Sequence, residues 1–340
     1  MSVSVVAKAS HSCKKCVLDS ATPGIFINED TGLCQFCEHF APLSSEKKEE
    51  YHARMDSLLK FPHKTGMYDV IFALSGGVDS SYALYRLKME YPNLTILAVQ
   101  FDNGFITETA LENAQKFCAL TKSTYIRLSL DQNALEETFT KAAHSIDAYP
   151  GAAKYRASDI CNTCISIIKQ KIIEIAIITK APFIVFAFSP GQADVPFVKL
   201  TKSILVWMRK LFDQSLKTIG VTDREQYLVD VHLIQPGSPE PEVMIIHPFL
   251  VWDYDKIKFK KECIQLGWID PLLKDHNSSN CLLNAFAIKK HFDKYHIHPY
   301  AYDLAALVRQ GNMKREDALK KLIVDVSDAS IEEIKLKLKL

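Results

Sequence analysis

The chain has 340 residues, of which 48% are hydrophobic and 24% are charged, a balance typical of globular proteins. Its formal net charge is +1, which excludes the basic excess of a bulk nucleic-acid binder but leaves room for a local basic groove. No stretch approaches the ~18 uninterrupted apolar residues of a membrane span, and the N-terminus lacks the apolar core of a secretory signal. We therefore expect a cytoplasmic protein of two or three structural units, with no membrane partner.

Residues 1–45 are rich in turns and carry two Cys-x2-Cys pairs with 17 residues between them. In a reducing compartment, thiols at such spacing are typical of a structural zinc site with four thiolate ligands. Residues 46–67 follow as a charged amphipathic segment, predicted to be a linking helix. The first unit is therefore predicted to be a zinc ribbon that binds Zn²⁺ through Cys13, Cys16, Cys34 and Cys37.

From Tyr68 onward, short apolar runs alternate with helical patterns. The runs "YDVIFAL", "LTILAVQFD", "TYIRLSL" and "APFIVFAFS" read as strands, each separated from the next by a helix. This alternation predicts an α/β fold with a doubly wound parallel sheet. We place that domain at residues 68–200, and a mainly helical C-terminal part at residues 201–340.

The stretch "SGGVDSS" begins directly after the first predicted strand and leads into a helix. Paired glycines let the backbone turn sharply and approach a ligand closely, and the helix offers free N–H groups at its positive end. Such a turn predicts an anion site. It is neither a P-loop, because Gly-Lys-Ser/Thr is absent, nor a dinucleotide fingerprint, because Gly-x-Gly-x-x-Gly is absent.

This stretch resembles the Ser-Gly-Gly-x-Asp-Ser loop of the PP-loop ATP pyrophosphatases, also called the adenine nucleotide alpha-hydrolase-like family. The resemblance implies that the loop binds ATP, that AMP is transferred to an acceptor oxygen, and that pyrophosphate leaves. The backbone amides would then face the phosphates, the two serine hydroxyls would donate to them, and Asp79 would hold Mg²⁺ as a catalytic group. The loop residues concerned are Ser75, Gly76, Gly77, Val78, Asp79 and Ser80.

Two further loops are expected at the same edge of the sheet. Phe101 and Asp102 end the second predicted strand, and Gly191 follows the fourth in "FSPGQAD". Ligands of open α/β sheets bind outside the carboxyl ends of the strands, so these residues are expected to border the nucleotide or the acceptor. A plain turn explains Asp102 and Gly191 equally well.

The N-terminal sequence "CKKCVLDSATPGIFINEDTGLCQFC" looks like the corresponding segment of the N-acetyl sugar amidotransferases, which are PP-loop enzymes. That resemblance implies an alternative in which ammonia from a partner glutaminase replaces an oxygen of an N-acetyl sugar. Some transfer-RNA thiolases of the superfamily carry a zinc ribbon in the same place. The segment therefore indicates the superfamily more than the substrate.

A third set of thiols comprises Cys161 and Cys164, at the start of a predicted helix, and the distant Cys281. The set is similar to that of the iron–sulfur-dependent PP-loop thiolases, in which three cysteines hold a four-iron, four-sulfur cluster and leave one iron open. It implies that the three cysteines take part in catalysis and that Cys281 joins the site from the C-terminal part. Direct persulfide chemistry and ordinary buried thiols remain open as alternatives.

These features predict an enzyme that adenylates a carbonyl oxygen with ATP and then transfers a nucleophile, sulfur in the first instance. The acceptor is expected to be a small molecule or RNA, and a sulfur donor or a glutaminase is the expected protein partner, with a homodimer as a further option. A nucleotide-binding protein without turnover is the alternative from another class. The sequence leaves open both the acceptor and the choice between sulfur and ammonia.

Overall fold

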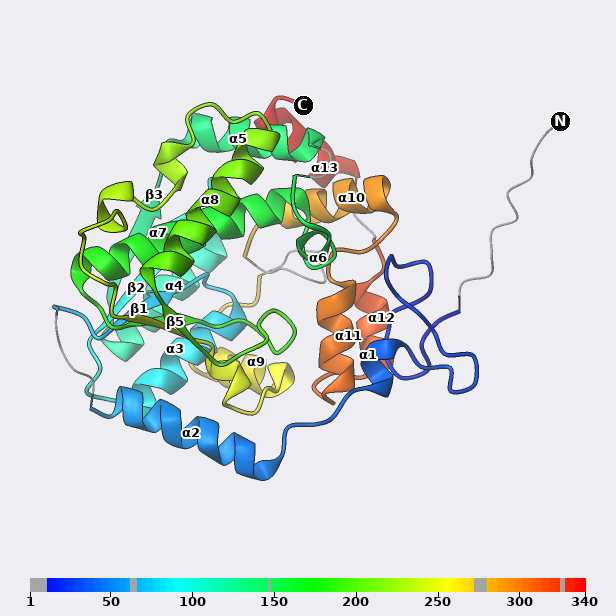
Figure 1. The fold of residues 1–340 in the computed structure, drawn as a ribbon, viewed down its shortest axis with the longest axis horizontal. Helices are drawn as coiled ribbons and strands as arrows, with labels where there is room; N and C mark the ends of the chain where they lie inside the picture. The colour runs from blue at the N-terminus through cyan, green and yellow to red at the C-terminus, as the bar shows by residue number, and fades with distance from the viewer. Residues whose placement is uncertain (1–10, 62–65, 146–147, 272–279, 325–327) are drawn as a thin grey trace.

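The structure is a computed structural model that describes residues 11–61, 66–145, 148–271, 280–324 and 328–340. Its centre is a six-stranded sheet in the order β3-β2-β1-β4-β6-β5. Helices surround the sheet (Figure 1). Neighbouring strands run parallel, except that β5 is antiparallel to β6. The strands are β1 (Val70–Ala73), β2 (Ile96–Asp102), β3 (Thr124–Ser129), β4 (Phe183–Phe186), β5 (Phe197–Leu200) and β6 (Val243–Ile246).

The central strands β1, β2 and β4 are buried on both faces, because their side chains point alternately to the two sides and helices cover both. In β1, Val70 and Phe72 pack on one face and Ile71 packs on the other. The first face is covered by helices α2 (Ser45–Leu59), α3 (Val78–Glu90), α4 (Glu108–Thr121) and α9 (Lys256–Gln265). The second is covered by α7 (Asp159–Thr179) and α8 (Lys202–Thr218). The predicted doubly wound α/β fold is confirmed.

A second layer of helices lies beyond the sheet. One cluster of buried side chains joins α5 (Gln132–His144), α7, α8, α10 (Leu283–Tyr295) and α13 (Asp328–Leu338). The remaining helices are short, and they are α1 (Gln35–Glu38), α6 (Gly151–Lys154), η1 (Glu225–Tyr227), η2 (Val231–Leu233), η3 (Pro248–Leu250), α11 (Ala301–Arg309) and α12 (Arg315–Lys321). Within the described part of the chain, no helix is both long and apolar enough to cross a membrane.

The sheet extends past the boundary expected at residue 200. β6 pairs in parallel with β4, and β5 closes the edge against β6. The sequence from Val243 to Ile246 is a continuous apolar run, as a strand buried on both faces requires. The part after residue 200 therefore supplies one strand of the sheet as well as helices.

The N-terminal segment packs on the C-terminal helices. Its four cysteines share a hydrophobic cluster with Ala301, Leu304 and Ala305 of α11 and with Ala318 of α12. In Figure 1 this segment lies beside α11 and α12, away from the strands. Two isolated antiparallel bridges, Ser12 with Asp19 and Ile27 with Cys34, are its extended pairings.

Candidate active site

The turn between β1 and α3 has the geometry that its glycines predict. Gly76 has a φ of +77°, and a Cβ there would lie 2.0 Å from the carbonyl oxygen of Ala110. Gly77 is the N-cap of α3, and no side chain caps this end of the helix. The first amides of α3 are therefore left facing the turn, as an anion site requires.

Contacts from other elements hold the turn in place. The Ser75 and Ser80 hydroxyl oxygens lie 2.9 Å apart, and the Ser75 amide donates to Ser80 Oγ at 3.2 Å. The Trp268 indole donates to the Gly76 carbonyl oxygen at 3.1 Å, and the Gln100 amide donates to that of Ser75 at 3.2 Å. The loop is thus preorganised by protein contacts alone.

Asp79 is closely surrounded by partners from the segment around α9. Its Oδ1 accepts from the Tyr254 hydroxyl at 3.0 Å, and its Oδ2 lies 3.1 Å from Lys256 Nζ. Burial, together with the Asp79 charge, raises the pKa of Tyr254 well above its usual value. Lys256 therefore offsets part of the negative charge that Asp79 would present to phosphate. A carboxylate has four lone-pair sites, so Asp79 keeps lone pairs that could coordinate Mg²⁺ beside a bound phosphate.

The end of β2 gives a mixed result for the expected residues. Phe101 lines the cavity described below, whereas Asp102 does not. The Asp102 carboxylate pairs with the Arg127 guanidinium at 2.5 Å and accepts from the Gly104 amide at 2.9 Å. These two contacts hold Asp102 at the end of β2, and its place beside the nucleotide or the acceptor stays a prediction. The neighbouring Asn103 faces the cavity instead.

Gly191 has a spacing role rather than a lining one. A Cβ on Gly191 would lie 2.7 Å from the backbone oxygen of Asp303, so glycine lets this loop approach α11 closely. The cavity wall here is formed by Ser189 and Gln192. Gly191 does not line the cavity itself, but it lets the neighbouring residues of its loop reach the cavity.

The cysteine pair after residue 160 lies on one stripe of α7. The Ser158 hydroxyl caps this helix by accepting from the Cys161 amide at 3.0 Å. Along the helix, cavity-lining residues recur at helical spacing, and they are Cys161, Cys164, Ile165, Ile168 and Lys169. Both thiols therefore face the same space as Lys169.

Cys281 reaches this site through a short pairing with the loop after β2. Ile106 and Cys281 form an antiparallel bridge, and the Leu282 amide donates to the Phe105 carbonyl oxygen at 2.9 Å. The Asn103 amide nitrogen lies 3.5 Å from Cys164 Sγ and 3.6 Å from Cys281 Sγ. Residues far apart in the sequence are thus brought together around one asparagine.

A single cavity of about 390 Å³ joins the loop and these thiols. Its size is within the range of small-molecule sites. The predicted residues that line it are Ser75, Gly77, Val78, Asp79, Ser80, Phe101, Cys161, Cys164 and Cys281. The anion-binding turn and the three cysteines therefore open onto the same space, which is the central geometric fact of this molecule.

Burial and neighbouring polar groups set the environment of the three cavity thiols. Burial raises the pKa of Cys164 above that of a free thiol, the nearby Cys281 and Cys161 add to the rise, and the Asn103 hydrogen bond opposes it. Cys161 Sγ also lies 3.8 Å from Asn284 Oδ1. A cationic centre would stabilise the thiolates here, and a cluster suits such a trio because each thiolate binds a different iron.

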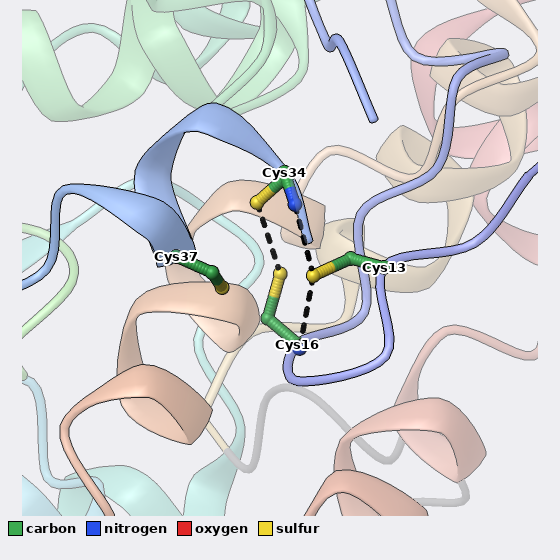
Figure 2. A group of neighbouring side chains, drawn as sticks. All are labelled: Cys13, Cys16, Cys34 and Cys37. Atoms are coloured by element: carbon green, nitrogen blue, oxygen red, sulfur yellow. Dashed lines mark hydrogen bonds between the residues drawn. The ribbon is translucent and has the colours of Figure 1, made fainter. Parts of the chain in front are cut away.

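The N-terminal cysteines form a tight tetrad (Figure 2). The Sγ atoms of Cys13, Cys16, Cys34 and Cys37 all lie within 4.8 Å of one another, and no other group of this kind occurs among the described residues. Cys16 Sγ and Cys34 Sγ are 3.6 Å apart. That spacing agrees with the roughly 3.8 Å between sulfurs of a tetrahedral Zn²⁺ site with ~2.3 Å bonds. The tetrad can therefore bind a metal ion, as predicted.

Hydrogen bonding polarises the tetrad. The bond between Cys16 and Cys34 lowers the pKa of Cys34 to about 5 and raises the pKa of Cys16. Burial raises the pKa of Cys37 to about 12. Four buried thiols in such proximity cannot all ionise without a cation, which is the usual chemistry of a structural zinc site.

From the sequence, none of the three lysines that line the cavity was identified, namely Lys169, Lys256 and Lys321. Lys169 lies eight residues after Cys161, so the helical period of α7 would have placed it on the same face. Burial lowers its pKa, and its Nζ lies 5.3 Å from the centre of the Phe188 ring. Lys256 carried no sequence signal, because its position depends on how α9 packs against α3.

Comparison with known proteins agrees with the geometry of the loop. The model of the tRNA methyl transferase HUP domain matches residues 68–139, the part of the chain from β1 to α5. The match contains the whole Ser-Gly-Gly-Val-Asp-Ser turn. This segment belongs to the adenine nucleotide alpha-hydrolase-like, or PP-loop, superfamily. The expected superfamily is confirmed, and the turn is referred to below as the PP-loop.

Other similar proteins are more distant. An uncharacterized protein of Methanocaldococcus jannaschii is 24% identical over 313 residues, which cover 91% of this chain and 92% of that protein. The U34-tRNA thiolase NcsA of Methanococcus maripaludis, solved with its [4Fe-4S] cluster, is 15% identical at a TM-score of 0.38, covering 97% of this chain and 88% of NcsA. An NH3-dependent NAD synthetase of Campylobacter jejuni is 14% identical at a TM-score of 0.31, covering 43% of this chain and 58% of that one. The two structural scores are too low to support an inference about activity.

Proposed function

We propose that this protein uses ATP to adenylate a carbonyl oxygen of its acceptor and then replaces that oxygen with sulfur. The observation that carries the proposal is the shared cavity, in which the PP-loop and Cys161, Cys164 and Cys281 line one space. An activated acceptor would then meet its nucleophile without leaving the site. Such positioning is worth several kcal/mol in two-step reactions.

Different residues of the site would bind different parts of ATP and its Mg²⁺ ion. The amides at the start of α3 and the Ser75 and Ser80 hydroxyls would bind the departing pyrophosphate. Asp79 would hold Mg²⁺, and Lys256 would balance the charge beside it. Phe101 offers an apolar surface for the adenine or the acceptor.

The three cavity cysteines would provide the sulfur site. Three thiolates on a four-iron, four-sulfur cluster would leave one iron free to take a sulfur ligand. Asn103 would orient Cys164 and Cys281, because its amide lies within hydrogen-bonding reach of both Sγ atoms. The N-terminal tetrad would hold Zn²⁺ and keep a structural role.

We propose a nucleobase carbonyl of transfer RNA as the acceptor. The family model that matches residues 68–139 is named for a transfer-RNA-modifying protein, which supports an RNA substrate. Three lysines line the cavity, namely Lys169, Lys256 and Lys321, against the two carboxyl groups of Asp79 and Asp303, so its lining has a small excess of basic groups although the chain is nearly neutral. A local positive site is what RNA phosphates and ATP both require.

Two measurements on anaerobically purified protein test this function. Iron, sulfide and zinc analysis is expected to give at least three iron atoms per chain in addition to zinc, and Cys161→Ala is expected to lose the iron only. Incubation with ATP, sulfide and an unmodified transfer RNA transcript is expected to release pyrophosphate and to yield a thiolated nucleoside by mass spectrometry. Zinc without iron after reconstitution, together with turnover on an N-acetyl sugar and ammonia, would contradict sulfur transfer and favour the amidotransferase.

A further inference from the structure

Helix α11 places a buried carboxyl group in the cavity wall. Asp303 lines the cavity, and the residue is only 6% exposed. Its Oδ1 is enclosed and has no hydrogen-bond partner within the part of the chain that the structure describes. Burying a polar group without a partner costs stability, so an unsatisfied carboxyl in a cavity points to a ligand that completes it.

The charged neighbours of Asp303 have opposite effects on its pKa. Arg156 and Asp194 act on it from the segments before α7 and before β5, and they pair with each other at 3.4 Å. Burial raises the pKa of Asp303 to about 7, with Arg156 opposing the rise and Asp194 adding to it. Both protonation states are therefore populated near neutral pH, as a group that takes and returns a proton requires.

The residue that precedes the helix of Asp303 contacts the thiol side of the cavity. Tyr300, one helical turn earlier, donates from its hydroxyl to Asn284 Oδ1 at 2.7 Å. The same Asn284 oxygen lies 3.8 Å from Cys161 Sγ. Tyr300, Asn284 and Cys161 all line the cavity with Asp303. This wall therefore borders the acceptor rather than the pyrophosphate, which belongs to the PP-loop at the start of α3.

We propose that Asp303 is the catalytic base that takes the N–H proton of an amide or lactam acceptor as its carbonyl oxygen is adenylated. This assignment rests on the proposed function. It defines the acceptor as a group in which N–H and C=O are adjacent, such as the imide edge of a uracil base. A carbonyl lacking that N–H would not use Asp303.

Adenylation and loss of the proton occur in one step. The acceptor oxygen forms a bond to the α-phosphorus of ATP, and the bond from that phosphorus to the bridging oxygen breaks, so pyrophosphate leaves with the electron pair. The N–H electrons form the C=N bond of the adenylated acceptor, and the proton moves to the Asp303 carboxylate. Removing this proton increases the negative charge on the attacking oxygen. General bases placed in this way contribute typically ~10²–10⁴-fold to a rate.

The substitution Asp303→Asn tests the assignment, because it keeps the shape of the side chain and removes its basicity. We would measure single-turnover pyrophosphate release from ATP with an unmodified transfer RNA transcript, using the reconstituted full chain between pH 5.5 and 9. The wild-type rate is expected to rise with pH through about 7, where the carboxylate forms. The variant is expected to be slower by roughly 10²-fold or more with no such rise, and to bind ATP with unchanged affinity. Asp317→Asn, an exposed carboxylate on α12, is the matched control and should retain the wild-type profile.

Thermal unfolding separates this role from a folding defect. The folded pKa of Asp303 lies above its unfolded value, so ionisation of Asp303 weakens the fold as pH rises through about 7. Asp303→Asn is therefore expected to raise the melting temperature at pH 8 relative to wild type, and to change it less at pH 5. A variant within threefold of the wild-type rate at pH 8 would overturn the proposal while leaving the adenylation function intact. A wild-type protein that releases no pyrophosphate with this acceptor would contradict the proposed function, and the role of Asp303 with it.

Discussion

Gly76 fixes the geometry of the PP-loop through two separate constraints. Its φ of +77° disfavours any residue with a side chain, and the carbonyl oxygen of Ala110 leaves no room for a Cβ. Gly220 has a similar φ of +82° but has nothing within 4 Å of its Cβ position. Substitutions at Gly76 and Gly220 therefore separate the cost of backbone strain from the cost of steric overlap with a neighbour.

We expect Gly76→Ala to lower the free energy of unfolding by about 2–4 kcal/mol, the sum of left-handed strain and overpacking. Gly220→Ala should cost only about 1 kcal/mol, which is the strain alone. Urea unfolding of both variants measures the difference. Equal losses would show that α4 moves away freely and that the close contact with Ala110 is not a constraint.

Lys256 is the second residue on which the loop depends. Its Nζ lies 3.1 Å from Asp79 Oδ2 at the edge of the cavity, where ATP phosphates would lie. We expect Lys256→Ala to weaken ATP binding by roughly 10- to 100-fold, because a charge-assisted contact is worth roughly 1.5–3 kcal/mol. Lys258 is an exposed lysine on the same helix and is absent from the cavity lining, so Lys258→Ala should bind ATP normally. Isothermal titration of both variants checks this, and equal affinities would remove Lys256 from the site.

At the scale of elements, α11 and α12 connect the cysteine tetrad to the cavity. The Arg315 side chain at the start of α12 donates to the Cys16 carbonyl oxygen at 3.0 Å and to that of Cys13 at 3.3 Å. Tyr302 of α11 donates to the Pro23 carbonyl oxygen at 3.1 Å, while Asp303, the next residue, lines the cavity. The N-terminal segment therefore supports the helix that forms one wall of the site.

We expect Arg315→Ala to weaken zinc retention by the tetrad about tenfold, because outer contacts of this kind orient metal ligands. Competition with a chromophoric chelator measures the affinity. Lys314→Ala, at the adjacent exposed position, should have the zinc affinity measured for the wild-type chain. If both variants lose zinc equally, the two hydrogen bonds from Arg315 have no role in holding the ligand loop.

Across the whole molecule, features that depend on short sequence spacings were predicted, whereas features that depend on tertiary packing were not. The PP-loop, the strands of the sheet and the tetrad each depend on short spacings, and the structure has them as predicted. The ion pair of Asp102 with Arg127 was not predicted, because it depends on the pairing of β2 with β3. Asp303 could not be found, because only the packing of α11 reveals that its carboxyl is buried in the cavity.

In the proposed function, the PP-loop and the three cysteines act in turn on one acceptor. This is tested most directly by assaying Cys164→Ala for both half-reactions with ATP, sulfide and an unmodified transfer RNA transcript, with pyrophosphate and thiolated nucleoside measured in the same samples. Cys118→Ala, a buried thiol of α4 outside the cavity lining, is the control. We expect Cys164→Ala to release pyrophosphate but to form no thiolated nucleoside, while the control does both. Wild-type levels of thiolated nucleoside from Cys164→Ala would contradict the proposed function.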